Sequence, residues 1–92
     1  MNNPYRVLGV DAKALSNGAI NVAVGLRAAN LRLFSNRKFH FAIGEEATTD
    51  STPVNADTAE FIGGLSPTDT VSVILADGET DGKIWATSIA RS

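Results

Sequence analysis

Residues 70–75 read TVSVIL, a stretch in which Val71, Val73 and Leu75 occupy every second position. Successive side chains of a β-strand point to opposite faces, so this alternation predicts a strand with one face on a core. The same period of two recurs in AINVAVGL at residues 19–26 and in FHFAIG at residues 39–44. Three separate runs with this period favour an all-β fold.

Four further runs predict strands, at residues 5–10, 31–34, 59–62 and 83–89. Turn-forming pairs lie between runs, and Asn17-Gly18, Asp77-Gly78 and Asp81-Gly82 are typical of tight hairpins. A polar, threonine-rich segment at residues 45–57 predicts a long exposed loop. About seven to eight short strands at this spacing predict a single small antiparallel β-sandwich or jelly-roll-like domain over residues 1–92, with residues 1–6 as a flexible N-terminal arm.

One stretch, residues 26–34, has a competing interpretation because its apolar positions also fit one face of a helix. A helix this short and without a good cap is marginal, so we favour a strand there. The alternation predicts a core made of Ile20, Val22, Val24, Phe39, Phe41, Ile43, Val71, Val73 and Ile84.

The composition predicts a thin core. Of the 40 hydrophobic residues among 92, 13 are alanine, which leaves 27 larger ones. A sandwich of this size has open sheet edges, and the lysines that could guard them are only Lys13, Lys38 and Lys83. A symmetric neighbour would cover such edges, so we expect a homo-oligomer, and a trimer in particular.

Several function classes are excluded by what the sequence lacks. The chain has no cysteine, so disulfide scaffolds and thiolate metal sites are ruled out. A net charge of −2 without a basic run argues against nucleic acid as a partner. No stretch approaches the roughly 18 apolar residues of a membrane span, and the N-terminus lacks the apolar region of a secretion signal. We therefore expect a soluble protein.

The stretch LADGETDGKIW at residues 75–85 places Asp77, Glu79 and Asp81 at alternate positions before Gly82, as a calcium loop begins. The twelfth position of such a loop needs a carboxylate, and that position is Ser88. We therefore interpret the stretch as an acidic hairpin turn, and expect no metal site and no cofactor.

The sequence predicts no catalytic residues. His40 is the only histidine, and it alternates with Phe39 and Phe41, which predicts a surface position on a strand. Adjacent residues on an extended chain point apart, so Glu45 and Glu46 do not form an acid/base pair. We expect a protein that is not an enzyme.

Trp85 has two interpretations. A single large aromatic residue in a thin sandwich favours a core position. Tryptophan is also enriched at interface hot spots, which makes Trp85 a candidate for partner binding. The alternation of this segment allows Trp85 to point either into the core or toward a partner.

The order of segments in the second half resembles that of small bacteriophage virion proteins of the β-sandwich type. The resemblance lies in LRLFSN, FHFAIG, the threonine-rich ATTDSTPV, AEFIGGLSPTDTVSVIL and GKIWATSI, and covers roughly residues 28–92. It implies a structural role on a virus particle assembled in the host cytoplasm, as capsid decoration, cement or a head–tail accessory protein. The implied partner is the major capsid protein or another virion protein.

Charge is divided along the chain. Six of the eight basic residues lie before residue 39, and every charged residue from Glu45 to Asp81 is acidic. This division suits docking on a lattice or head-to-tail contact. Because the arginine guanidinium offers forked donors, we take Arg27, Arg32 and Arg37, with Trp85, as the candidate partner-binding residues.

Two other classes stay open. A carbohydrate-binding or adhesion module is also a small β-sandwich, but usually presents several exposed aromatic rings, whereas most aromatic residues here occupy core-patterned positions. A small ligand-binding barrel would need more apolar residues to line a cavity.

Overall fold

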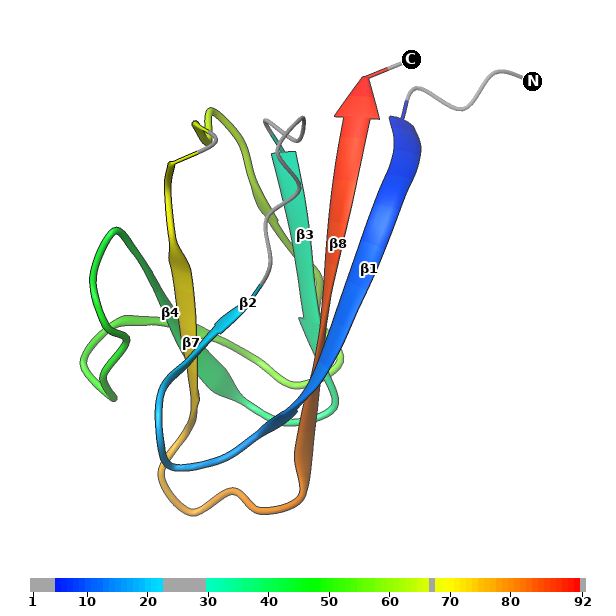
Figure 1. The fold of residues 1–92 in the computed structure, drawn as a ribbon. Helices are drawn as coiled ribbons and strands as arrows, with labels where there is room; N and C mark the ends of the chain where they lie inside the picture. Colours follow the sequence, from blue (N-terminus) through cyan, green and yellow to red (C-terminus); the bar gives the residue numbers. More distant parts are fainter. Residues whose placement is uncertain (1–4, 23–29, 67, 92) are drawn as a thin grey trace.

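The computed structural model describes residues 5–22, 30–66 and 68–91. These residues contain eight β-strands and no helix, and the strands form two antiparallel sheets of four (Figure 1). The expected all-β sandwich is therefore confirmed. Within the described ranges, nothing forms a helix that could cross a membrane.

Each sheet draws its strands from both halves of the chain. Sheet A contains, in spatial order, β1 (Tyr5–Leu15), β8 (Gly82–Arg91), β3 (Asn30–Ser35) and β6 (Glu60–Ile62). Sheet B contains β2 (Ile20–Val22), β7 (Val71–Leu75), β4 (Phe39–Ile43) and β5 (Thr52–Val54).

The strand pairing is that of one long hairpin wound into a roll. The tip of the hairpin is the β4–β5 pair, and β3–β6, β2–β7 and β1–β8 follow from the tip outward. Two further pairings, β3–β8 and β4–β7, close the roll. This connectivity is an eight-stranded jelly roll. Its consequence is that most connections cross from one sheet to the other.

The hairpin predictions were wrong for this reason. Residues 16–19 join β1 of sheet A to β2 of sheet B, and residues 76–81 join β7 of sheet B to β8 of sheet A. The acidic segment still turns sharply, with positive φ angles of 83° at Gly78 and 56° at Asp81. Turn residues therefore marked the bends correctly but did not show which strands pair.

Two boundaries also differ from the sequence-based expectation. Tyr5 and Arg6 belong to β1 rather than to a flexible arm, and residues 1–4 lie outside the described residues. The segment at residues 45–57 is not one continuous loop, because it contains β5, which pairs with β4. The strand favoured for residues 26–34 is confirmed for residues 30–34, which belong to β3, and the rest of that stretch lies outside the described part.

The core lies between the sheets and contains most of the expected residues. Val22, Phe39, Val71, Val73 and Ile84 are buried, and Ile20 and Phe41 are partly buried against them. The prediction for Ile43 was wrong: it ends β4 and is 40% exposed. Val24 lies outside the described residues. The core also contains Leu15, Leu31, Leu33, Val54, Ile62, Leu65, Leu75 and Ala86.

Candidate interaction surface

The outer side of sheet A brings together two of the four predicted partner-binding residues. Arg32 on β3 and Trp85 on β8 occupy neighbouring strands of this sheet. Arg37 is exposed in the connection between β3 and β4. Arg27 lies outside the described residues. The candidate site is therefore built around the pair that the fold unites.

Strand β8 decides the orientation of Trp85. Ile84 and Ala86 are both 0% exposed and face the core, so Trp85 between them faces outward. Its side chain is half-buried rather than part of the core. The core interpretation of Trp85 was wrong because the alternation of β8 has Ile84, not Trp85, on the inner face.

Strand β3 has the same alternation. Leu31 and Leu33 are 0% exposed on the inner face, which leaves Arg32 and Phe34 on the outer face. The ring of Phe34 lies 6.0 Å from that of Trp85, centroid to centroid, at an interplanar angle of 53°. Tilted pairs at this separation are favourable because the positive edge of one ring meets the negative face of the other.

A cation lies over each ring of this pair. The guanidinium carbon of Arg32 is 5.2 Å from the centroid of Phe34, and Nζ of Lys83 is 5.2 Å from the indole of Trp85. Neither cation forms a salt bridge with the described residues, where the ion pair found joins Lys13 to Asp11. Both charges are thus available to an anionic partner group.

A row of side chains extends this surface across the whole sheet. Val10 pairs with Thr87, Thr87 with Arg32, and Arg32 with Phe61, one residue from each strand. Paired residues of an antiparallel sheet share a face. Val10 is 58% exposed and Phe61 60% exposed. We call the surface formed by Val10, Arg32, Phe34, Phe61, Lys83 and Trp85 the aromatic face.

The edges of the sheets are guarded, which the sequence did not reveal. On β1, Asp11 and Lys13 pair with the core residues Ala86 and Ile84 and so point inward, and a bulge interrupts the register between Val7 and Gly9. Inward charges and bulges are devices that discourage strand addition. The other three edge strands, β2, β5 and β6, have only three residues each, and edge strands this short also discourage strand addition.

Part of the outer side of sheet B is covered by the chain itself. The loop of residues 44–51 lies over it, with the Ala47 amide donating to Oγ of Ser72 at 2.9 Å. Ala47 is 2% exposed and Ser72 2% exposed. His40 faces this side, as its alternation predicted, but it is 9% exposed, and its Nδ1 donates to the Ser51 carbonyl at 2.8 Å. The prediction of a surface histidine was therefore wrong.

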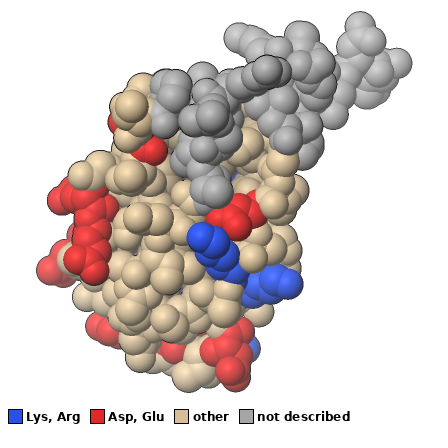
Figure 2. Space-filling view, viewed as in Figure 1, with Lys and Arg blue, Asp and Glu red and all other residues tan. Residues whose placement is uncertain are grey.

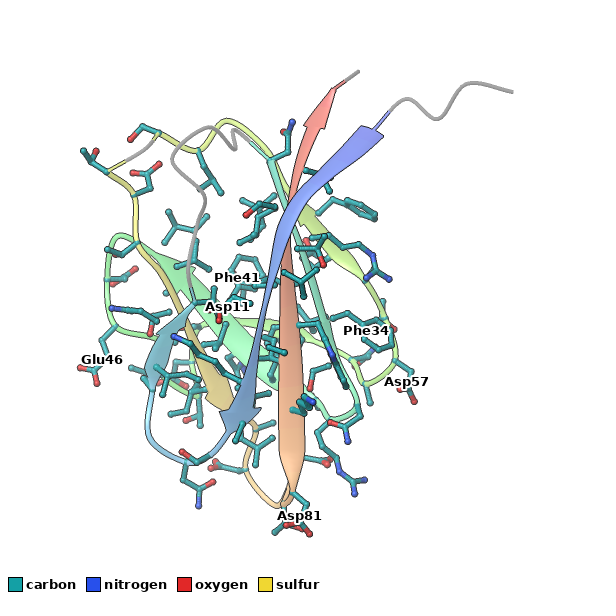
Figure 3. The ribbon with its side chains drawn as sticks, turned by 45° about the vertical axis from the view of Figure 1, so that its right-hand side comes forward. Asp11, Phe34, Phe41, Glu46, Asp57 and Asp81 are labelled. Carbon is teal, nitrogen blue, oxygen red and sulfur yellow. The ribbon has the colours of Figure 1, made fainter. Side chains whose placement is uncertain are left out.

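Two small hollows lie beside this loop. One, of about 330 Å³, is lined by Ala19, Asn21, Glu45, Glu46, Thr70 and Ser72. The other, of about 300 Å³, is lined by Phe41, Ala42, Ile43, Glu45, Asp50, Ser51 and Thr52. Glu46, which lines the first hollow, and Phe34 of the aromatic face lie on opposite sides of the molecule (Figure 3). Acidic side chains also line one margin of the view in Figure 2.

The acidic connection between β7 and β8 has the geometry of a turn. The Glu79 amide donates to the Ala76 carbonyl at 3.1 Å. Ser88, which would stand at the last calcium-ligand position, lies six residues along an extended strand from Gly82, roughly 20 Å away at the usual rise per residue. In residues 5–22, 30–66 and 68–91, no three histidine or acidic side chains come together as a metal site would require.

Comparison with protein-family models, with curated proteins and with solved structures finds no match for this chain.

Proposed function

We propose that this chain is a non-enzymatic structural protein of a bacteriophage particle. In this proposal it attaches to the symmetric protein shell as capsid decoration, as cement or as a head–tail accessory protein. The partner is the major capsid protein or another virion protein, and the chain acts as a homo-oligomer, a trimer in particular.

The observation that carries the proposal is the aromatic face. Interface centres are enriched in aromatic residues and arginine, and tryptophan and arginine are the most frequent hot spots. Phe34, Trp85 and Phe61 lie beside Arg32 on one side of one sheet, and Phe61 is 60% exposed. Monomeric proteins seldom leave a contiguous apolar patch without a use for it, so this surface is the natural contact with a larger assembly.

The fold agrees with this role without deciding it. Jelly rolls build viral capsid proteins, and they also build lectins and cupins, so topology alone leaves the function open. The guarded edges are more informative. Because β1 carries a bulge and inward charges, assembly through strand addition is disfavoured, and contact through a sheet face is the alternative.

Co-sedimentation with purified shells that lack this chain tests the proposal. The wild-type chain is expected to sediment with the shells, and Trp85→Ser, which removes the central ring, is expected to weaken binding at least ~tenfold. Lys38→Glu is the matched control for surface changes, because Lys38 is exposed in the β3–β4 connection, outside the aromatic face. A wild-type chain that stays in the supernatant with every shell and tail preparation would overturn the proposal.

A second candidate function is carbohydrate binding, and one observation favours it. Three of the six aromatic residues, Phe34, Phe61 and Trp85, face outward, whereas core positions were expected for most of them. Exposed rings are what a sugar-binding surface offers. A glycan array separates the candidates: binding that is lost in Trp85→Ser, together with no attachment to shells, would favour the carbohydrate function.

A further inference from the structure

The aromatic face needs a partner surface that combines apolar groups with negative charge. Its exposed large side chains are Val10 and Phe61, and its two cations, Arg32 and Lys83, lie over rings without a carboxylate partner among the described residues. Two such faces placed against each other would bring four cations into one contact. Like charges across an interface are unfavourable, so pairing of the face with itself is disfavoured.

A hollow beside a strand of the other sheet offers the complement. The 300 Å³ hollow beside β4 has an apolar part formed by Phe41, Ala42 and Ile43, and two carboxylates, Glu45 and Asp50. We call it the acidic hollow. Ile43 is the third exposed large hydrophobic residue of the described chain, 40% exposed, and it lines this hollow. Among the side chains whose exposure the structure describes, the exposed large hydrophobic ones are therefore confined to the aromatic face and the acidic hollow.

The size of the acidic hollow suits one protruding side chain. Pockets for drug-sized ligands span about 300–1,000 Å³, and this hollow lies at the lower end of that range. Phe61 is the most exposed of the large hydrophobic residues, and Arg32 is its cross-strand neighbour. A Phe61 ring placed in the hollow would therefore bring a guanidinium to Glu45 and Asp50, where forked donors can meet carboxylates.

We infer that the β6 margin of the aromatic face is occupied by a second copy of this chain, which receives Phe61 and Arg32 in its acidic hollow, so that Phe34 and Trp85 remain open to the shell. The inference rests on the proposed role in a symmetric assembly, and it names the contact between copies. Phe34 of the aromatic face and Glu46, the neighbour of Glu45 in the chain, lie on opposite sides of the molecule (Figure 3), and the two surfaces share no residue, so the contact is head-to-tail. A head-to-tail contact closes into a ring, such as a trimer, where the rotation between copies permits it, and otherwise forms a filament.

Two variants, each with one of the surfaces destroyed, test this arrangement. The face variant combines Arg32→Ser with Phe61→Ser, and the hollow variant combines Glu45→Lys with Asp50→Lys, so that the two altered surfaces do not attract each other. All four residues have partly or fully exposed side chains, and thermal melting checks that both variants fold. Sedimentation velocity then gives the mass of each protein alone and of an equimolar mixture, from micromolar to hundreds of micromolar concentration.

The wild type is expected to exceed its monomer mass of 9.7 kDa as concentration rises, and to return toward it in high salt. Each variant alone is expected to remain a monomer. The mixture is expected to reach twice the monomer mass and no more, because only one intact aromatic face and one intact hollow are left to meet.

Three results would overturn the inference: a wild type that stays at 9.7 kDa, a hollow variant that assembles like wild type, or a mixture that contains only monomers. Shell binding separates this failure from failure of the proposed function. A monomeric wild type that binds shells through Trp85 would overturn the copy-to-copy contact and leave the virion role intact. A chain that forms the expected head-to-tail assembly but binds no virion component would support the copy-to-copy contact and overturn the virion role.

Discussion

The rings of Phe34 and Trp85 lie 6.0 Å apart on adjacent strands, on the side of sheet A that faces away from the core. Each ring also lies beneath a cation, Arg32 or Lys83, at 5.2 Å. A sheet fixes the backbone of all four residues, so the rings are held in place before any partner arrives. Preorganisation of this kind reduces the entropy cost of binding.

A double-mutant cycle measures the coupling of these two rings. We expect Phe34→Ala and Trp85→Ala to be non-additive in urea unfolding, with a coupling free energy of about 0.5–1.5 kcal/mol, typical of aromatic pairs. Phe41 packs against the core on β4 of the other sheet, away from the ring pair, and is the matched control, so Trp85→Ala combined with Phe41→Ala should be additive. Additive effects for Phe34 and Trp85 would show that the rings do not stabilise each other.

The two core phenylalanines should differ in their contributions to stability. Phe39 is 0% exposed and Phe41 only partly buried, although both occupy the inner side of β4. We expect Phe39→Ala to lower the free energy of unfolding by about 3–5 kcal/mol, and Phe41→Ala to lower it by less. Denaturant unfolding checks the order, and an equal or larger loss for Phe41 would contradict the burial described here.

The loop over sheet B should depend on the hydroxyl of Ser72. Ser72→Ala removes the acceptor for the buried Ala47 amide, and an unsatisfied buried donor costs about 1–3 kcal/mol. Hydrogen exchange of the Ala47 amide should accelerate in the same variant. Ser66→Ala changes an exposed serine and should leave both quantities nearly unchanged. Unaltered protection of Ala47 in Ser72→Ala would mean that another group holds the loop.

Local alternation predicted the strands well, because side-chain period is a property of each segment alone. Which strands pair is a property of the whole chain, and here the sequence misled. Asn17-Gly18 and Asp77-Gly78 have hairpin chemistry, yet both join strands of different sheets. The winding of the long hairpin brings β3 beside β8, and no local signal in either strand indicates it.

The candidate surface was predictable only in part. Arg32 and Trp85 were chosen for their residue types, and the fold places them on the same side of adjacent strands. Phe34 and Phe61 were missed, although the phase of LRLF, with Leu31 and Leu33 inward, already implies that Phe34 points outward. The orientation of Trp85 could not be predicted from the sequence, because Ile84 and Trp85 are adjacent and either could occupy the core. Only the pairing of β8 with its neighbours decides which of the two faces inward.

Calcium should not change the stability of the fold. The segment from Asp77 to Asp81 closes as a turn, and Ser88 lies far along β8, so a complete ligand set does not form from this stretch. We expect equal melting temperatures in millimolar calcium and in chelator. A ligand that binds the folded state raises the melting temperature, so a rise of many degrees with calcium would show that the acidic turn binds the ion.

The central claim is that the aromatic face is covered when this chain assembles, and Trp85 is the only tryptophan that can report it. Acrylamide quenching of its fluorescence should be measured for the dilute protein and again for the protein bound in its assembly. We predict that the quenching constant falls several-fold on assembly and that the emission shifts to shorter wavelength, because a partner excludes water from the indole. Assembled protein whose tryptophan is quenched as readily as that of the dilute chain would contradict the claim, since the aromatic face would then remain open while the chain is bound elsewhere.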